Sequence, residues 1–440
     1  MNHLEISAAL QARWPENKVA PSLSRIRALM DLLGEPQRSC PVIQITGTNG
    51  KGSTAIMIES LLRALNLRVG RFSSPHLVDV TERISIDGEP IAADKFDELV
   101  EEVMPFVEMV DARELDGVKM TFFEVITGLA YQAFADAPVD VAVVEVGMGG
   151  TWDATSVADP AVAVVAPIGL DHTHILGSTI EEVATEKAGI IKPGSVAVLA
   201  GQTPEAAKIL LKRALEVGAE VRAEGPDFGL LDRQLAVGGQ VIRINTAEGP
   251  LGDLYLPLYG DYMAQNAALA VAAVEAFLGG RALAPDVIEE GLAAVKAPAR
   301  LELVRTSPSI LLDTCHNPQA AHATMGAIAE SFNFEPLIGV VALMRDKDAA
   351  GVLGEFRTQM TQIVCTSLPS FDRALSADEL AERASGLFPP EFVHTADDIS
   401  AAIEKAVQIA DAAGPGAGII VCGSVYLAGE ARELLKKEED

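Results

Sequence analysis

Short apolar runs alternate with helical patterns along almost the whole of this chain. The run Val42–Ile45 precedes a helical pattern, Val139–Val146 follows another, and Ala161–Ala166 and Val196–Leu199 continue the series. Strands that are separated by helices in this way form a mainly parallel sheet covered by helices, which is the α/β fold class. The segment Leu230–Asn245 differs, because its glycines and its two-residue alternation predict a small antiparallel excursion.

A break near residue 298 predicts two domains. A chain of 440 residues is long for a single core. Pro298 interrupts the pattern after the helix predicted over Asp286–Val295, and the alternation restarts with the apolar run Ile310–Asp313. We therefore predict a P-loop-type, mainly parallel sheet domain over 1–297 and a smaller Rossmann-like α/β domain over 298–440.

The charge of the chain excludes several classes of partner. With 34 Lys and Arg against 62 Asp and Glu, the net charge of −28 repels a nucleic acid backbone. Met1–Trp14 lacks the features of a secretory signal, and no apolar run is long enough to suggest a membrane span. The cysteines are few and widely spaced, which is typical of reduced thiols in the cytoplasm. They are Cys40, Cys315, Cys365 and Cys422.

The first predicted strand leads into a glycine-rich turn with one lysine and two adjacent hydroxyls. Glycines let backbone N–H groups approach an anion, and the helix that follows adds its positive end. Lys51 can place its charge between phosphates, and Ser53 or Thr54 can hold Mg²⁺. In the common pattern the hydroxyl follows the lysine directly, whereas Gly52 intervenes here. A helix N-terminus without a ligand is the alternative, but phosphate binding is favoured. The segment is Gly47-Thr48-Asn49-Gly50-Lys51-Gly52-Ser53-Thr54.

Acids stand at two further strand ends. Glu145 ends a buried-looking strand, and Asp171 and His172 follow the next one. Ligands of an open parallel sheet gather outside the carboxyl ends of its strands, so Glu145 is placed to bind Mg²⁺ or to order water. His172 is placed to meet a second metal ion. The alternatives are an acid that caps a neighbouring helix and a histidine with a structural role.

Other charged residues have less decisive positions. Lys187 ends a predicted helix ahead of Gly189, where a cation is favourable without any chemistry. Asp313 and His316 follow a strand of the second domain and form either a hydrogen-bonded pair or a helix cap. Arg300 can reach an interdomain cleft, where two domains can close on a nucleotide.

These segments, in this order, resemble the folylpolyglutamate synthase and dihydrofolate synthase family of the Mur ligase superfamily. Each signature is short, but the ordered set is highly specific and spans nearly the whole chain. Besides the glycine-rich turn, the signatures are Ser73-Ser74-Pro75-His76-Leu77, Thr121-Phe122-Phe123-Glu124, Glu145-Val146-Gly147-Met148-Gly149-Gly150, Asp153-Ala154-Thr155, Asp171-His172, Glu186-Lys187-Ala188-Gly189-Ile190, His316-Asn317-Pro318 and Asp346-Lys347-Asp348.

The resemblance implies ATP-dependent amide bond formation. The carboxylate of dihydropteroate or of a reduced folate attacks the γ-phosphate of ATP, and the amino group of L-glutamate then displaces phosphate from the acyl phosphate. Lys51 is expected to neutralise charge on the moving phosphoryl group. Ser53 and Glu145 are expected to bind a first Mg²⁺, and His172 a second.

The same resemblance assigns roles to further residues. The lysine that matches Lys187 can be carbamylated in such ligases, which turns a cation into a carboxylate that can bind Mg²⁺. The implied catalytic residues are Lys51, Lys187, His172 and His316. Implied ATP contacts are Thr48, Asn49, Gly50, Lys51, Gly52, Ser53, Thr54, Asn266, Arg300 and Asp313. Implied substrate contacts are Ser22, Arg25, Ser74, Thr121, Phe123, Asp153 and, on the glutamate side, Ser424.

Some positions depart from the family pattern or have a plain alternative. Thr151 stands where arginine is common, which puts one contact with an anionic ligand in doubt. Ser156, Ala299 and Thr314-Cys315 are smaller departures. Phe123 can be simple core, because its neighbours are apolar at helical spacing.

The sequence therefore predicts a cytoplasmic, monomeric ligase with small-molecule substrates, and with neither nucleic acid nor membrane as a partner. A cell-wall peptide ligase is the nearest rival, but it usually has a further N-terminal domain, and only about 40 residues precede the glycine-rich turn. A nucleotide-switch protein is a rival of another class. It needs neither two strand-end metal sites nor a second nucleotide-binding domain.

Overall fold

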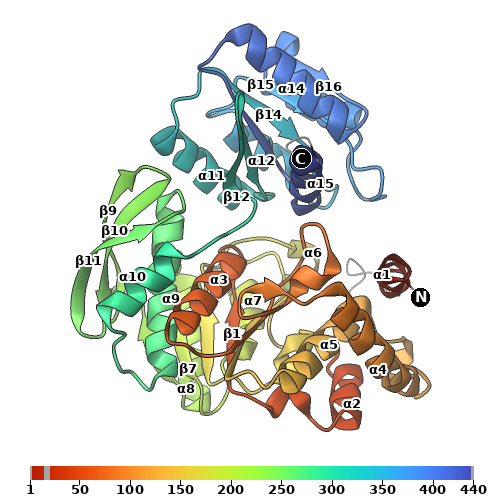
Figure 1. Ribbon diagram of the computed structural model, residues 1–440, viewed down its shortest axis with the longest axis vertical. Coiled ribbons are helices and arrows are strands. Elements are labelled where there is room, and N and C mark those ends of the chain that lie inside the picture. The colour runs from red at the N-terminus through yellow and green to blue at the C-terminus, as the bar shows by residue number, and fades with distance from the viewer. Residues whose placement is uncertain (1, 14–19, 438–440) are drawn as a thin grey trace. The chain divides into compact units, whose positions relative to one another are not determined.

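The computed structural model describes residues 2–13 and 20–437, which form two compact units (Figure 1). The first unit consists of the residues up to Gln234, together with Val241–Leu256 and Ala264–Val295. The second consists of Leu235–Gln240, Pro257–Met263 and the residues from Lys296 onward. Residue 1 and residues 438–440, at the outer ends of the two predicted domains, lie outside the described residues.

An eight-stranded sheet, counted over the described residues, forms the centre of the first unit, in the order β4-β3-β2-β5-β1-β6-β7-β8. The neighbours β2, β5, β1, β6, β7 and β8 run parallel to one another. β3 and β4 pair antiparallel at the β2 end of the sheet. Because β1 lies between two later strands, the segment after β1 is at the switch point where such sheets bind ligands. The strands are β1 (Val42–Thr46), β2 (Val69–Phe72), β3 (Ile84–Ile86), β4 (Glu89–Pro90), β5 (Val141–Glu145), β6 (Val162–Val165), β7 (Val196–Leu199) and β8 (Glu220–Ala223).

The helices around this sheet begin at residues that suit helix N-termini. Thr121 and Thr179 accept from the backbone N–H three residues on, in capping boxes with Glu124 and Glu182. The helices are α1 (His3–Gln11), α2 (Ser24–Leu32), α3 (Lys51–Ala64), α4 (Ala93–Asp111), α5 (Phe122–Asp136), α6 (Thr173–Leu176), α7 (Ile180–Lys187), α8 (Pro204–Val217), α9 (Asp261–Phe277) and α10 (Pro285–Ala293).

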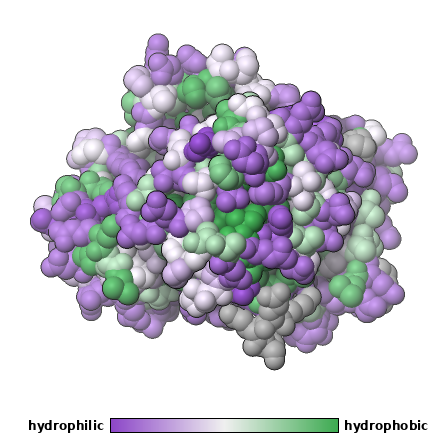
Figure 2. All heavy atoms as spheres, turned by 90° about the horizontal axis from the view of Figure 1, so that it is seen from above, coloured by the Kyte–Doolittle hydropathy of each residue, from purple (hydrophilic) through white to green (hydrophobic). Residues whose placement is uncertain are grey.

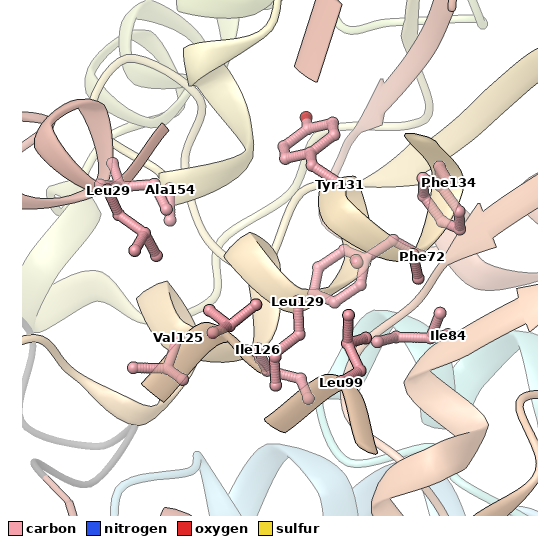
Figure 3. Close-up of a cluster of buried hydrophobic side chains, with 14 of the residues drawn as sticks. Leu29, Phe72, Ile84, Leu99, Val125, Ile126, Leu129, Tyr131, Phe134 and Ala154 are labelled. Atoms are coloured by element: carbon pink, nitrogen blue, oxygen red, sulfur yellow. The ribbon is translucent and has the colours of Figure 1, made fainter. Parts of the chain in front are cut away.

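A large apolar cluster of this unit packs α2, α4 and α5 against the β2 side of the sheet. Figure 3 shows its side chains converging from these elements, among them Leu29, Phe72, Leu99 and Leu129. The same helix α5 carries Thr121 at its N-cap and Phe123 in its first turn. The core therefore holds these two predicted substrate residues on a rigid element.

Three consecutive strands form a separate small sheet in the order β11-β10-β9. This sheet includes the segment Leu230–Asn245, for which a small antiparallel excursion was predicted. The connections between them are two residues long, too short for a parallel crossover, so the strands are antiparallel. The strands are β9 (Gly229–Ala236), β10 (Gly239–Thr246) and β11 (Gly249–Leu256).

The second unit contains a six-stranded sheet, counted within the described range, in the order β12-β13-β17-β14-β15-β16. All pairs run parallel except β12 with β13. The strands are β12 (Arg300–Thr306), β13 (Ser309–Asp313), β14 (Leu337–Val341), β15 (Gln362–Cys365), β16 (Val393–Thr395) and β17 (Gly418–Cys422). The helices are α11 (Pro318–Ser331), α12 (Ala349–Phe356), α13 (Ala377–Ala384), α14 (Ile399–Ala413) and α15 (Val425–Lys437).

These sheets confirm the predicted fold class, a mainly parallel α/β unit with a small antiparallel excursion and a second, smaller α/β unit. In the part of the chain that the structure describes, no helix has both the length and the apolar character needed to cross a membrane.

Candidate active site

Residues 47–54, here called the phosphate loop, connect β1 to α3 and are anchored to the segment after β6. The Thr48 N–H donates to Pro167 O over 2.9 Å. The Thr48 hydroxyl donates to Gly169 O and accepts from Gly169 N, each over 2.9 Å. These bonds hold the phosphate loop at the carboxyl edge of the sheet, where the sequence predicted it.

Two glycines of the phosphate loop make approaches that a side chain would prevent. A Cβ atom on Gly47 would lie 2.7 Å from the Cβ of Ala166. Gly50 has a left-handed φ of 86°, and a Cβ atom there would lie 2.8 Å from Asn266 Oδ1. The structure therefore brings Asn266, on α9, directly against the phosphate loop.

The hydroxyls of the loop lie in the first turn of α3. Ser53 is 3% exposed and Thr54 is fully buried. The Thr54 hydroxyl has no hydrogen-bond partner among the described residues. The N-terminus of α3 adds a positive potential to this turn, which favours an anion beside Lys51.

Two lysines meet at one carbonyl oxygen of the phosphate loop. Lys51 Nζ donates to Gly47 O over 3.2 Å and to Thr48 O over 3.3 Å. Lys187 Nζ donates to the same Gly47 O over 2.7 Å, although it comes from the end of α7. Burial and the nearby charge of Lys51 lower the pKa of Lys187 to about 7. Burial beside a second lysine therefore argues against the interpretation of Lys187 as a solvent-exposed cation that only stabilises the end of a helix.

The sequence pattern placed Gly189 as the C-cap glycine of this helix, and this interpretation is wrong. The C-cap is Ala188, and the chain continues as a short 3₁₀ turn over Ala188–Ile190. A Cβ atom on Gly189 would collide with the hydroxyl of Thr151. The Thr151 hydroxyl also donates to Glu186 O over 3.1 Å. Thr151 thus packs against the turn that carries Lys187.

Glu145 ends β5, next to the phosphate loop in the sheet, and is 5% exposed. Its Oε2 accepts from the N–H of Ser74 over 3.3 Å. Mg²⁺ commonly takes one or two carboxylates and completes its shell with waters and phosphate oxygens, so Glu145 with the Ser53 hydroxyl fits it. Within the described residues, no group of three or more His, Cys, Asp and Glu side chains forms a metal cage.

Asp171 and His172 follow β6 at the same edge. His172 has a left-handed φ of 50° and is the N-cap residue of α6. Its N–H donates to Asp171 Oδ1 over 2.8 Å, and its Nε2 lies 3.9 Å from the same oxygen. The acid and the imidazole are therefore held together, which suits a cation site and equally suits a structural pair.

Asp153 lies beneath the segment that follows Glu145. It is 3% exposed and accepts from Met148 N over 2.9 Å and from Thr155 N over 3.0 Å. Burial raises the pKa of Asp153, and these hydrogen bonds oppose the shift. Asp153 shapes the glycine turn after β5, while its predicted contact with substrate stays a prediction.

The other predicted folate-side residues join one polar network. Arg25 is 1% exposed and donates to both oxygens of Glu124 over 3.1 Å. It also lies 3.2 Å from Asp116, which accepts from the Ser22 hydroxyl over 2.6 Å. Glu124 accepts from Thr121 N over 2.8 Å. Sequence analysis missed Asp116, because it lies in no signature.

Phe123 contacts the turn that follows Glu145. A Cβ atom on Gly147 would lie 2.5 Å from Cζ of Phe123, and the Phe72 ring centroid is 5.9 Å away. Phe123 is partly exposed, so its ring is only in part core. It lies where the β5 turn and the β2 side of the sheet meet.

The predicted residues of the second unit lie at the carboxyl edge of its own sheet. Arg300 pairs with Asp313 across β12 and β13. Asp313 accepts from Leu301 N over 3.0 Å and from Cys315 N over 2.8 Å. His316 Nδ1 lies 2.8 Å from Thr314 O. Asp313 therefore organises its own turn.

Two observations extend this description of the second unit. Ser424 follows β17, the parallel neighbour of β13, and is 3% exposed. Ala299, where the family commonly has glycine, has a left-handed φ of 53°. The backbone conformation explains why glycine suits that position.

Sequence analysis also missed Arg71 and Glu59, which form a partly buried ion pair beside Ser73. A signal was present. Glu59 is a charged residue within a helix whose neighbouring positions are apolar, two turns beyond Lys51.

Comparison with known proteins gives the class of protein first. The Mur ligase middle domain matches residues 45–274, and the Mur ligase glutamate ligase domain matches residues 299–425. The chain is thus a Mur-type ligase, and its P-loop unit and second α/β unit are those of an ATP-dependent enzyme.

Individual relatives show to which family of Mur-type ligases the chain belongs. The dihydrofolate synthase/folylpolyglutamate synthase of Mycobacterium tuberculosis is 44% identical in an alignment 459 residues long. The alignment covers 99% of this chain and 94% of the relative. A structure of M. tuberculosis folylpolyglutamate synthase with ADP has a TM-score of 0.94 at 44% identity and covers 98% of each chain. Escherichia coli FolC with DHPP and ADP has a TM-score of 0.86 at 29% identity, over 100% of this chain and 99% of that one. The chain belongs to the folylpolyglutamate synthase and dihydrofolate synthase family.

Proposed function

We propose that this protein adds L-glutamate to dihydropteroate, to reduced folates, or to both, by ATP-dependent amide ligation through an acyl phosphate. The observation that carries the proposal is the single sheet edge at which Lys51, Lys187 and Glu145 lie beside the phosphate loop. The names of the relatives supply the substrate class.

In the first step, the phosphate loop and Lys51 bind the ATP phosphates. Loop N–H groups and the N-terminus of α3 compensate the negative charge of the phosphates. Lys51 neutralises the charge that develops on the γ-phosphoryl group during transfer. Ser53 and Glu145 would hold Mg²⁺, which when bound neutralises the phosphates. The substrate carboxylate then attacks phosphorus, and ADP leaves.

In the second step, the amino group of L-glutamate attacks the acyl carbon, and phosphate leaves. We assign His172 and His316 to catalytic roles, and Asn266, Arg300 and Asp313 to ATP. Ser22, Arg25, Ser74, Thr121, Phe123 and Asp153 are assigned to the folate side, and Ser424 to L-glutamate. Ser22, Arg25 and Thr121 are each hydrogen-bonded to Glu124 or Asp116. This network supports their assignment to one wall of the folate site.

Lys187 is proposed to be carbamylated. Its neutral amine adds to CO₂, releases one proton and becomes a carbamate anion. Burial and the neighbouring Lys51 favour loss of the lysine charge, and an anion beside Lys51 removes their repulsion. The product can serve as a second carboxylate for a Mg²⁺ ion.

Further parts of the proposal concern the whole chain. Residues 1–297 are assigned to ATP and folate binding, and residues 298–440 to L-glutamate and further ATP contacts. A monomer in the cytoplasm is proposed, and four free cysteines are in keeping with a reducing compartment.

The test is ADP release with ATP and Mg²⁺ in the presence of dihydropteroate, tetrahydrofolate or a nucleotide-linked peptide, each with and without L-glutamate. We expect glutamate-dependent release with at least one pterin compound, and an added glutamate residue in the product by mass spectrometry. Turnover on neither pterin compound would sink the proposal. Turnover on the peptide alone would assign the chain to cell-wall ligation.

A further inference from the structure

Arg71 joins three segments of the first unit close to Glu145. It lies on β2, and its side chain is 12% exposed. Its Nε donates to Glu59 Oε2 over 2.7 Å, Nη1 to the Ser73 hydroxyl over 2.9 Å and Nη2 to the Ser85 hydroxyl over 3.0 Å. One planar guanidinium thus sets the relative positions of a helix, a loop and a neighbouring strand.

The first of these contacts connects Arg71 to the helix of the phosphate loop. Glu59 lies on α3 about two turns beyond Lys51, and its side chain is 5% exposed. Its other oxygen accepts from Gly88 N over 3.1 Å. The pair resists separation, because separation leaves the charge of the buried Glu59 uncompensated. Glu59 therefore keeps α3 and β2 in a fixed relative position.

The second contact passes this constraint toward Glu145. The Ser73 hydroxyl accepts from Arg71, and the Ser73 N–H donates to Arg83 O over 3.0 Å. The next residue, Ser74, donates its N–H to Glu145 Oε2. The orientation of the Glu145 carboxylate is thus coupled to Arg71 through two adjacent residues.

We infer that Arg71 is a positioning residue for the ligase reaction. It holds the Ser73–Ser74 segment so that the Glu145 carboxylate keeps a fixed place relative to Ser53 on α3. The inference rests on the proposed function, because it takes Glu145 and Ser53 as the residues that hold the metal ion. Loss of a group that bonds a metal ligand directly weakens metal binding about 10- to 100-fold, and Arg71 acts one step further away, so we expect an effect at the lower end of this range.

The first test replaces Arg71 with lysine, which keeps the charge but loses the three-way fork. Mn²⁺, titrated into protein saturated with ADP and followed by electron paramagnetic resonance, reports metal binding without turnover. We expect about 10-fold weaker Mn²⁺ binding in Arg71→Lys, a matching rise in the Mg²⁺ needed for half-maximal turnover, and unchanged metal-free ADP binding. Arg68→Lys is the control, since the Arg68 side chain is 47% exposed and its Nε lies 3.7 Å from the exposed Asp87.

The second test uses two serines that accept from the same guanidinium. Ser73→Ala removes the acceptor that leads to Glu145, and Ser85→Ala removes the one on β3. We expect weaker Mn²⁺ binding for Ser73→Ala alone. The double variant Arg71→Lys with Ser73→Ala should be no worse than Arg71→Lys, because both changes break one connection.

Three results would overturn the inference: unchanged Mn²⁺ affinity in Arg71→Lys, equal effects of the two serine variants, or additive effects in the double variant. If Arg71→Lys does not fold, the comparison of Ser73→Ala with Ser85→Ala decides. A wild-type protein that binds Mn²⁺ with ADP but shows no glutamate-dependent turnover contradicts the proposed function and leaves this test valid.

Discussion

Lys187 shows how a single residue takes its chemistry from its surroundings. In sequence it is a lysine in the last turn of a helix, where a cation interacts well with the helix dipole. In the structure it is 4% exposed and shares Gly47 O with Lys51. Two ammonium groups at one oxygen repel each other, and conversion of one into an anion would relieve that repulsion.

Lys187→Ala is expected to lower turnover about 100-fold, because it removes the amine that would become a metal-binding carboxylate. Turnover is measured at saturating Mg²⁺, and Lys208→Ala, on the exposed side of α8, is the control. Acetate or another small carboxylate should restore part of the lost activity. Near-normal turnover of Lys187→Ala would rule out an essential carbamate.

The residue scale also sets a limit on prediction from sequence. The phosphate loop and Glu145 were predictable, since strand, glycines and charges follow one another locally. Arg25 was not predictable as a buried ion, because its partners Glu124 and Asp116 lie far away in the chain. Glu59 and Arg71 were missed although they are only 12 residues apart, because a charge in a helix does not show which cation it will meet.

At the scale of the elements, α1 is held by polar contacts at both ends. His3, its first residue, lies 2.7 Å from Asp97 on α4 and 3.3 Å from Asp79. After its last turn, Arg13 donates to Asp111 over 2.5 Å and to Met120 O over 3.1 Å. The helix therefore connects the start of α4 with the segment that precedes α5.

The first of these anchors predicts a pH dependence. The hydrogen bond to Asp97 raises the pKa of His3, burial opposes the shift, and the charge of Asp79 adds to it. The stabilising contribution is thus complete below about pH 6.5 and is lost as the pH rises through the higher folded pKa. Hydrogen exchange of α1 amides should speed up over that range by more than the intrinsic rate.

His3→Gln is the matched control for this experiment. Glutamine cannot gain a charge, so the extra pH dependence of exchange in α1 should disappear, while exchange in α5 stays unchanged. The same pH dependence in His3→Gln would show that another group controls α1.

Long elements with clear periodicity were predictable, and short or interrupted ones were not. The predicted runs Val42–Ile45 and Ala161–Ala166 match β1 and β6 to within one residue at each end. The short strands β3 and β4 have three and two residues, which is too few to show an alternation. Pro105 lies inside α4. A proline in this position argues against a continuous helix in the sequence, but the packed helix tolerates it.

At the scale of the whole molecule, the excess of acids has a cost. The net charge is −28, and the face in Figure 2 is mainly hydrophilic, with apolar residues in small areas. Like charges at this density repel one another and destabilise the compact state. Bound anions such as ATP must be held by local groups, which explains why lysine and N–H groups concentrate at the phosphate loop.

Salt is therefore expected to stabilise the protein. An increase from about 10 mM to about 150 mM NaCl shortens the screening length from about 30 Å to about 8 Å. The apparent Tm should rise by a few degrees, as measured by scanning fluorimetry. Choline chloride should act equally, because the effect is screening. A fall in Tm, or a rise with NaCl alone, would contradict this explanation.

The position of β1 between β5 and β6 has a consequence for how the site is assembled. During synthesis, β1 and the phosphate loop emerge long before residues 141–165, which supply both neighbouring strands. Until then neither edge of β1 is paired, and Thr48 lacks the carbonyl groups of Pro167 and Gly169. A nascent chain that ends before β6 thus carries every residue of the loop and lacks the support that shapes it. Since β6 and residues 167–169 complete this support, we expect a nascent chain to bind nucleotide only after they have emerged and paired with β1 and Thr48.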